Sequence, residues 1–404
     1  MKVLVCHNRY QRPGGEDVVF EAETALLEAA GHTVIRHERS NHDIEALGRL
    51  DLARRTVSNP QEARAVGAIV ARERPDVVHF HNTFPLVSPG ALRAARREGA
   101  AVVQTLHNFR LVCPSADLLR DGRLCEDCIG RTFAWPALRH ACYRDSVAAS
   151  ATIAASTAWH HLRGTWSAAV DRYVVPTRIV RDKFVQGGFP ADRIDVKPNF
   201  VARDPGIGCG EKGHAVFVGR LSPEKGLDVL LEAWRDVPGD TGLVIVGDGP
   251  SAPLVQEAAR RDPRIEWVGH RSRDEVERIV GAASLLVMPS VWYETFGLCI
   301  VEAFARGTPV VASRLGAMAE LVEDGQTGAL FDPGDAPDLA RTVIDLQRNP
   351  TRLQRMRGAA RAAYEARFSA PANLSMLLAI YERAIRRHQE GSRIMLNETE
   401  SASF

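Results

Sequence analysis

The sequence predicts an α/β protein with two doubly wound, parallel-sheet domains. Short runs rich in Val, Ile and Leu alternate with helical patterns along most of the 404 residues, which is typical of parallel sheets covered on both faces. A domain contains roughly 100–200 residues, so this length fits two. Residues 201–210, rich in Gly and Pro, have no periodicity and separate two such series. The composition, 45% hydrophobic and 25% charged, excludes collagen-like, disordered and coiled-coil classes.

The first series predicts an N-terminal domain over residues 1–200. It begins with a strand at 2–7, followed by Gly14, Gly15 and a helix that ends near Ala30. Further strands are expected at 34–37, 77–81, 102–107, 173–176 and 194–197, with a helix at 178–186 between the last two. A Cys-rich insertion over about 109–145 interrupts this pattern.

The second series predicts a C-terminal domain over residues 201–370. Its strands are expected at 215–219, 243–247, 265–268, 285–289 and 310–313. A final helix over 371–390 is expected to pack back toward the N-terminal domain, and the polar residues 391–404 to form a loose tail. Ligands of doubly wound sheets bind outside the carboxyl ends of the strands. We therefore look for the site in loops that follow strands, in a cleft between the two domains.

Charge and hydropathy restrict the partners and the compartment. The net charge of +1 gives no global electrostatic reason for binding nucleic acid. The uncharged stretch 146–159 is shorter than the roughly 20 apolar residues of a spanning helix. The N-terminus resembles a strand and has no signal-peptide pattern. We expect a cytoplasmic protein, and contact with the inner face of a membrane stays open.

Two cations follow the first strand of the second series. Arg220 and Lys225 lie in the segment from Gly219 to Gly226, between a strand and a helix. Free N–H groups and the dipole at a helix N-terminus favour an anion, and two cations there would neutralise a diphosphate. The alternative is a pair of solvated cations on a turn.

Two carboxylates follow a later strand of the same series. Glu294 lies in the loop after the strand, and Glu302 lies inside the next helix. Phe296, Gly297 and Leu298 form the N-terminus of that helix, and Gly297 allows a ligand to approach closely. A hydroxyl acceptor, a phosphate cradle and a second hydroxyl acceptor then stand in one line, as a sugar, a diphosphate and a ribose would need.

With these motifs in place, the sequence resembles the retaining GT-B glycosyltransferases of glycosyltransferase family four, over nearly the whole chain. The motifs that stand in family order are Gly219-Arg220, Glu224-Lys225-Gly226, Gly247-Asp248-Gly249-Pro250, Pro289-Ser290 and the Glu294–Glu302 pair. One departure is Gly316-Ala317-Met318, where the family often has two adjacent glycines. The resemblance implies a GT-B fold of two Rossmann-like domains.

The resemblance also implies roles for individual residues. Arg220 and Lys225 would bind the donor diphosphate, Glu294 the donor sugar and Glu302 the ribose diol. The implied nucleotide-sugar site comprises Gly15, Gly219, Arg220, Lys225, Gly247, Val268, His270, Glu294, Phe296, Gly297, Leu298 and Glu302. The implied catalytic residues are Glu294, His107, Arg220 and Lys225.

Four residues in the N-terminal domain have alternative interpretations. Gly15 would lie in a loop that closes over the donor phosphate, but Gly-Gly is often only a flexible turn. His107 ends a predicted buried strand and would contact the donor sugar, whereas a core histidine with a satisfied hydrogen bond is the alternative. His79 and His81, on another strand, are interpreted as mainly structural, with the lining of an acceptor pocket as the alternative.

The cysteines of the insertion suggest a structural metal. Four of them, Cys113, Cys125, Cys128 and Cys142, fall within 30 residues in the order C-x11-C-x2-C-x13-C. Four soft ligands suit a closed tetrahedral zinc site, and the intervening sequence would gain stability from it. Free thiols, a redox C-x2-C pair and a site with His140 in place of one cysteine are alternatives.

The predicted reaction moves a sugar from a nucleotide diphosphate sugar to a hydroxyl, with retention of anomeric configuration. No Asp-x-Asp sequence occurs, so we expect no divalent metal in catalysis. The enzyme is expected to act in surface polysaccharide or glycolipid assembly, with a lipid-linked saccharide as its acceptor. A small natural product is the alternative acceptor. A nucleotide-sugar epimerase on the same fold and a non-catalytic scaffold are the rival functions. Base, sugar, acceptor and linkage are not encoded in recognisable motifs.

Overall fold

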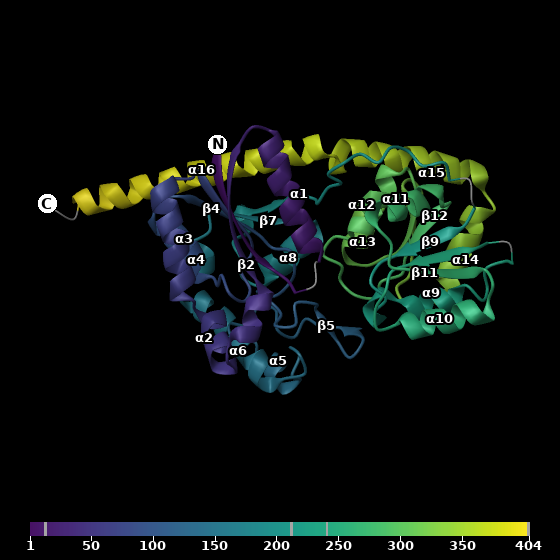
Figure 1. Ribbon diagram of the computed structural model, residues 1–404, viewed down its shortest axis with the longest axis horizontal. Coiled ribbons are helices and arrows are strands. Elements are labelled where there is room, and N and C mark those ends of the chain that lie inside the picture. Colours follow the sequence, from purple (N-terminus) through teal and green to yellow (C-terminus); the bar gives the residue numbers. More distant parts are fainter. Residues whose placement is uncertain (12–13, 211–212, 240, 402–404) are drawn as a thin grey trace. The chain divides into compact units, whose positions relative to one another are not determined.

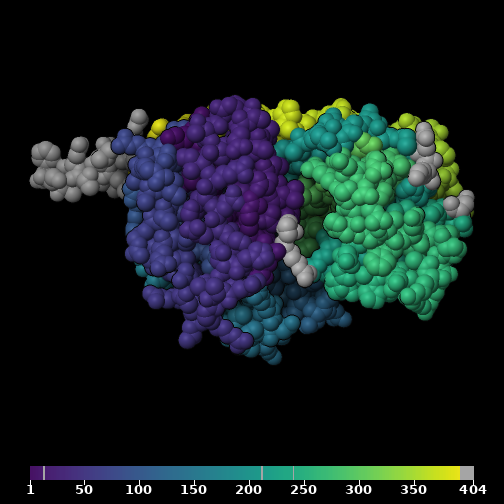
Figure 2. All heavy atoms as spheres, viewed as in Figure 1, coloured from purple at the N-terminus to yellow at the C-terminus, as the bar shows by residue number. Residues whose placement is uncertain are grey.

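The computed structural model describes residues 1–11, 14–210, 213–239 and 241–401, and the backbone alone from 392 (Figure 1). The chain divides into two compact units. The first comprises Met1–Leu118, Glu126–Lys197 and the chain from Asn373 onward, and the second comprises Leu119–Cys125 and Pro198–Ala372. Figure 2 shows the surface of both units in the same view.

The first unit is built on a six-stranded parallel sheet in the order β2-β1-β3-β4-β7-β8. Its strands are β1 (Lys2–Arg9), β2 (Thr33–Ser40), β3 (Val77–Asn82), β4 (Ala101–Thr105), β7 (Arg172–Val175) and β8 (Ile194–Val196). Each overlaps one of the predicted apolar runs. Strands β3 and β4 are buried along their whole length, as expected for a sheet with helices on both faces.

Helices surround this sheet. Those within the first unit are α1 (Gly15–Ala29), α2 (Arg49–Val57), α3 (Pro60–Glu73), α4 (Gly90–Arg97), α5 (Trp135–Arg139), α6 (Val147–Leu162), α7 (Thr165–Ala168) and α8 (Arg178–Gln186), with the 3-10 segments η1 (Asn41–Ala46) and η2 (Ala191–Arg193). Helix α1 packs on β1 and β3 and places Phe20 in the core with Val3 and Val5.

Helix α16 (Ala370–Ser401) begins in the second unit and continues in the first, where Leu377, Ile380 and Tyr381 join the core. This is where the sequence analysis expected the final helix to pack. The expected loose tail over 391–404 is wrong for the described part, because α16 is helical to Ser401. The segment contains Glu, Arg, Met and Leu and lacks proline, so nothing in it ends the helix.

The second unit has its own six-stranded parallel sheet, in the order β11-β10-β9-β12-β13-β14. Its strands are β9 (Ala215–Val218), β10 (Leu243–Val246), β11 (Ile265–Gly269), β12 (Leu285–Met288), β13 (Val310–Ser313) and β14 (Gly328–Phe331). The sequence analysis missed β14, because Gly-Ala-Leu-Phe is four residues long and has a weak strand pattern.

The helices of the second unit are α9 (Leu227–Ala233), α10 (Ala252–Arg261), α11 (Arg273–Ala282), α12 (Leu298–Ala305), α13 (Gly316–Leu321), α14 (Ala336–Gln347) and α15 (Pro350–Ala363), with the short helices η3 (Pro223–Lys225) and η4 (Tyr364–Phe368). The short hairpin of β5 (Leu119–Arg120) and β6 (Arg123–Leu124), from the Cys-rich insertion, also clusters with this unit.

The chain enters the second unit at Pro198, close to the predicted boundary at 200. The Gly- and Pro-rich segment that follows is held against the unit: the amide of Gly208 donates to the carbonyl of Arg306, and Arg357 donates to the carbonyl of Gly208. Among the described residues, no helix is long and apolar enough to cross a membrane.

Candidate functional site

The site is built on loops at the carboxyl ends of four neighbouring strands, β11, β10, β9 and β12. The loop after β9 leads through η3 to Gly226, which has φ +68° and begins α9. A Cβ at Gly226 would stand 2.0 Å from the carbonyl oxygen of Pro289, so only glycine permits this contact. The amide of Val291 donates to the carbonyl of Glu224 at 3.0 Å. These contacts hold Lys225 against the loop after β12.

The two predicted groups Lys225 and Glu294 form a direct ion pair. The Nζ of Lys225 lies 2.6 Å from Oε1 of Glu294, and the hydroxyl of Ser290 donates to the same oxygen at 2.9 Å. The Lys225 ammonium also lies 5.3 Å from the centroid of the Trp292 ring, a favourable cation–π position. Glu294 is 6% exposed, so its charge depends on these donors.

The electrostatics keep Lys225 charged. Desolvation alone lowers the pKa of Lys225, but the nearby Glu294 carboxylate outweighs it and the net shift is upward. Arg220, in the same loop, is exposed and extends the positive charge of the β9 loop toward solvent. The geometry thus combines a buried carboxylate, an ammonium and a guanidinium in two adjacent loops.

Helix α12 carries the second predicted carboxylate. Its N-cap, Gly297, has φ +90°, and a Cβ there would lie 3.1 Å from Cε of Met288. Leu298 opens the helix, and Glu302 lies about one turn farther on, partly buried. Burial raises the pKa of Glu302, and Arg273 partly opposes this. Phe296, predicted as a donor contact, has its ring in the core, so only its backbone is available to a ligand.

The sequence analysis did not consider Cys299, which lies between the two carboxylates. Burial raises the pKa of its thiol to about 12, Lys225 lowers it, and both Glu294 and Glu302 raise it. The thiol donates to Sδ of Met288 at 3.7 Å. The thiol therefore lies near the predicted acids and the cation in the second unit.

The loops after β10 and β11 adjoin the β9 loop. Gly247 has φ +135°, and a Cβ there would stand 1.9 Å from the carbonyl oxygen of Gly219. The amide of Gly219 donates to Val246, and the amide of Gly247 donates to Gly269. The predicted base-facing turn lies here as well, with Val268 partly buried and His270 exposed. All the predicted donor residues of the second unit therefore lie at one sheet edge.

The single glycine at the noted departure from the family also belongs to this edge. Gly316 has φ +55°, and a Cβ there would lie 3.3 Å from Cδ1 of Tyr293 and 3.6 Å from the carbonyl oxygen of Glu294. One glycine is therefore sufficient for close packing of the α13 start against the Glu294 loop.

Gly15 and His107 lie in the first unit. Gly15 is exposed at the first position of α1, and the amide of Gly14 donates to Oδ2 of Asp17 at 2.8 Å. Oδ1 of the same carboxylate lies 2.9 Å from Nε2 of His7, which fixes the start of the helix on β1. Gly15 therefore begins a well-anchored helix at the carboxyl end of β1.

His107 follows β4 and belongs to a buried cluster of histidines. Its Nε2 lies 3.2 Å from Nδ1 of His81, and their rings stack with centroids 5.3 Å apart. Burial, with the charges of His7 and Lys197, lowers the pKa of His107 to about 3, so the imidazole is neutral at pH 7. His79 is fully buried, and its ring nitrogens contact the hydroxyls of Tyr381 and Thr105.

A second cluster that the sequence did not reveal lies at the same edge of the first unit. The amide of Asn108 donates to the Glu16 carboxylate, and burial raises the pKa of Glu16. The guanidinium of Arg110 lies 4.5 Å from the ring of Phe84 and 5.1 Å from that of Tyr143. The cluster joins segments about 90 residues apart, so no local motif marks it. The one sequence signal was that Glu16 and Asn108 are the neighbours of Gly15 and His107.

The four predicted zinc ligands are assigned to different units: Cys113, Cys128 and Cys142 to the first, and Cys125 to the second. Cys128 and Cys142 meet in a small apolar cluster with Ala137 and Ala154 of the first unit, and Sγ of Cys113 lies 3.2 Å from Oγ of Ser115. Cys125 belongs to the segment that clusters with the second unit. Four cysteine thiolates suit a structural zinc ion. The zinc site that the cysteine spacing predicts therefore stays a prediction.

The cluster of Glu23, His79 and His81 also brings three ligand atoms within 4.8 Å of one another. However, the Lys197 ammonium lies 2.5 Å from Oε1 of Glu23. A second cation beside it would be repelled, so this buried group is better explained as an ion pair within the core.

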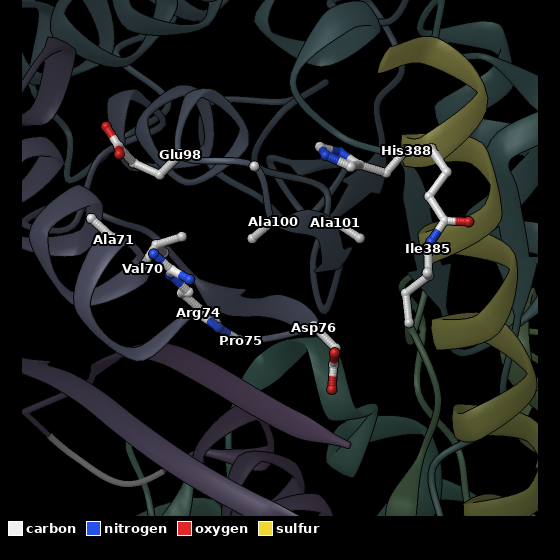
Figure 3. Close-up of a pocket in the computed structure, with 12 residues that line it drawn as sticks. Val70, Ala71, Arg74, Pro75, Asp76, Glu98, Ala100, Ala101, Ile385 and His388 are labelled. Carbon is white, nitrogen blue, oxygen red and sulfur yellow. The ribbon is translucent and has the colours of Figure 1, made fainter. Parts of the chain in front are cut away.

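A cavity of about 540 Å³ lies at the other edge of the first sheet (Figure 3). Pro75 and Asp76 precede β3, and Gly99 and Ala100 precede β4, so the cavity adjoins the amino ends of the strands. Figure 3 shows His388 of α16 on its far wall. It is thus separate from the edge that carries His107 and Gly15.

A family model described as Glycosyltransferase Family 4 matches residues 13–204, and one described as Glycosyl transferases group 1 matches residues 212–349. D-inositol 3-phosphate glycosyltransferase of Mycolicibacterium smegmatis is 38% identical over 180 residues, 42% of this chain and 40% of that protein. Glycogen synthase of Mycobacterium tuberculosis is 37% identical over 169 residues, 40% of each chain. The chain thus spans about two fifths of the length of these curated relatives.

Solved structures agree in fold. The Anabaena protein HepE in complex with UDP has a TM-score of 0.66 at 20% identity, with 95% of this chain and 100% of that chain covered. Sucrose-phosphate synthase of Thermosynechococcus elongatus has a TM-score of 0.69 at 18% identity, with 95% and 99% covered. The fold is that of the GT-B glycosyltransferases, as predicted. The two family models cover most of the sequence between them, and the chain belongs to the group 1, family 4 glycosyltransferases.

Proposed function

We propose that this protein transfers a sugar from a nucleotide diphosphate sugar to a hydroxyl acceptor. The observation that carries the proposal is the Lys225–Glu294 ion pair at the carboxyl edge of the sheet. Nζ of Lys225 lies 2.6 Å from Oε1 of Glu294, and the Ser290 hydroxyl donates to the same oxygen. The similar proteins support it. One relative is a D-inositol 3-phosphate glycosyltransferase, another is a glycogen synthase, and the HepE structure contains UDP.

The charges suit a donor with a diphosphate and a sugar. Lys225 and Arg220 are cations at pH 7 and would stabilise the departing diphosphate, since preorganised charge acts most strongly where negative charge develops. When a phosphate binds the Lys225 ammonium, Glu294 would lose this donor and would accept hydrogen bonds from sugar hydroxyls in its place. Glu302, about one turn into α12, would accept from the ribose diol.

Retention of configuration and independence of divalent metal are further parts of the proposal. Glu294 is already engaged by Lys225 and Ser290, so it suits a sugar-holding role better than that of a nucleophile of the glycosidase type. Front-side attack would then let the leaving phosphate accept the acceptor's proton. The lack of an Asp-x-Asp sequence supports a diphosphate site built from Arg220 and Lys225 rather than from a metal.

We propose that the acceptor belongs to surface polysaccharide or glycolipid assembly and is a lipid-linked saccharide, met at the inner face of a membrane. A small natural product is the alternative acceptor. The cluster of Glu16, Asn108 and Arg110 offers hydrogen-bonding groups for such an acceptor, on the same sheet edge as His107. We also propose that Cys113, Cys125, Cys128 and Cys142 hold a structural zinc ion, which would tie the insertion together without taking part in catalysis.

Calorimetric titration with UDP, GDP and ADP in the presence of EDTA tests the donor site. We expect tight binding of one nucleotide by the wild type, and binding at least as tight by Glu294→Ala, because Glu294 contacts the sugar and its removal frees the Lys225 ammonium for the diphosphate. Slow hydrolysis of the matching nucleotide sugar should be lost in that variant and kept in Glu266→Ala, an exposed acid on β11. Interconversion of the sugar would favour an epimerase. Absence of nucleotide binding would contradict the proposal.

A further inference from the structure

We propose that helix α6 of the first unit docks the protein on an anionic lipid bilayer. Its 16 residues, Val147–Leu162, include no Lys, Arg, Asp or Glu. Helices at a protein surface normally place charged residues on the side that faces water. An exposed and wholly uncharged face therefore indicates an apolar environment that covers it.

The exposed face of α6 is an uncharged stripe that ends in two large apolar side chains. Exposed or partly exposed residues recur at 148, 152, 155, 159 and 162, and these steps of four and three residues place them on one side of the helix. Trp159 is 47% exposed and Leu162 is 75% exposed. The opposite side, with Ile153 and Ala154, is buried. The stripe, defined as Ala148, Thr152, Ala155, Trp159 and Leu162, is thus not part of the core.

Helix α2 extends this surface. It packs on α6, where the hydroxyl of Ser156 donates to the carbonyl of Thr56 at 3.1 Å and Nε2 of His160 contacts the carbonyl of Val57 at 2.8 Å. Leu50 of α2 is 89% exposed. The two helices lie next to each other in the first unit, and their residues form part of its surface in the space-filling view (Figures 1 and 2).

The charges beside the stripe favour anionic lipid. The guanidinium of Arg163 lies 5.1 Å from the centroid of the Trp159 ring, and Arg49 and Arg54 are exposed on α2. The one acid of these two helices, Asp51, pairs with Arg55 at 2.9 Å. A tryptophan beside an arginine suits the boundary between headgroups and acyl chains. At 16 residues, α6 would lie in the plane of the interface instead of spanning it.

Vesicle sedimentation of the full chain tests this surface, with vesicles of equal parts phosphatidylglycerol and phosphatidylcholine, and with phosphatidylcholine alone. We expect the wild type to bind the anionic vesicles and to release them at high salt. Trp159→Ser with Leu162→Ser should weaken binding at least tenfold, and Arg163→Ser about fivefold. Leu254→Ser, which removes an exposed leucine from α10 of the second unit, should bind like the wild type.

Other outcomes would overturn the proposal. These are no vesicle binding, equal binding to both vesicle types, or a wild-type dimer that the Trp159→Ser, Leu162→Ser variant turns into a monomer, which would assign the stripe to a second copy of the chain. Thermal unfolding followed by circular dichroism checks that each variant is folded. The inference deepens the membrane contact proposed above, and since vesicle binding needs neither donor nor acceptor, its failure is distinguishable from failure of sugar transfer.

Discussion

Removal of the Lys225 ammonium should destabilise the second unit measurably. In Lys225→Met the aliphatic stem remains, but Glu294, with 8% of its side chain exposed, loses its cation and keeps only the Ser290 hydroxyl. Breaking a buried ion pair from one side costs about 3–5 kcal/mol. Because Lys225 itself is 21% exposed, water can partly replace it, and we expect the lower end, about 3 kcal/mol. For a domain of this size that corresponds to a fall in Tm of roughly 6–12 °C.

Scanning calorimetry of four proteins isolates the pair: wild type, Lys225→Met, Glu294→Gln and the double variant. The double variant should recover about 2 kcal/mol relative to the sum of the single changes, because the unpaired charge is gone. The pKa of Lys225 is raised in the folded state, so its contribution is complete below its unfolded pKa, about 10.4, and is lost as pH rises through the higher folded value. A loss under 1 kcal/mol at pH 7, or strictly additive variants, would refute the reasoning.

Three further predictions concern the loops, the buried histidines and the cysteines. Gly247→Ala should abolish nucleotide binding measured by calorimetry, since its Cβ would overlap a backbone carbonyl, whereas Gly269→Ala, with φ +71° and nothing within 4 Å, should cost only about 1–2 kcal/mol of backbone strain. Since the pKa of His107 is depressed to about 3, stability should fall as pH drops below the unfolded value of about 6.5, by up to about 1.4 kcal/mol per pH unit, and urea titrations of His107→Gln should show a shallower fall. Elemental analysis should find about one zinc per wild-type chain and much less after Cys125→Ser with Cys128→Ser; a metal-free wild type would contradict the zinc proposal.

Sequence patterns were sufficient for most of the fold because a parallel sheet buries both faces. Leu285 to Met288, for example, form a run without polar alternation, and that run is a buried strand at the predicted place. Local patterns were insufficient where the element was short or depended on distant contacts. Residues 328–331 form an edge strand only because Val310 and its neighbours pair with them, and residues 391–401 continue a helix that composition alone had suggested to end.

The placement of the predicted site residues was foreseeable, because loops at strand ends meet at one edge and motifs far apart in sequence converge there. The contacts between these residues were not predictable from the sequence. Sequence analysis assigned Lys225 to the diphosphate and Glu294 to the sugar as separate groups, whereas in the structure each is the other's counter-ion. Their spacing of 69 residues carries no signal of this pairing, which depends on the fit of Gly226 against Pro289.

This pairing has a consequence for the order of events at the site. A buried carboxylate is costly without a cation, so the ligand-free protein keeps Lys225 turned toward Glu294. A diphosphate alone would draw the ammonium away and leave Glu294 with the Ser290 hydroxyl as its remaining donor. A complete nucleotide sugar would supply hydroxyl donors to Glu294 at the same moment. The site should therefore favour the intact donor over the nucleotide that remains after transfer, which would aid product release.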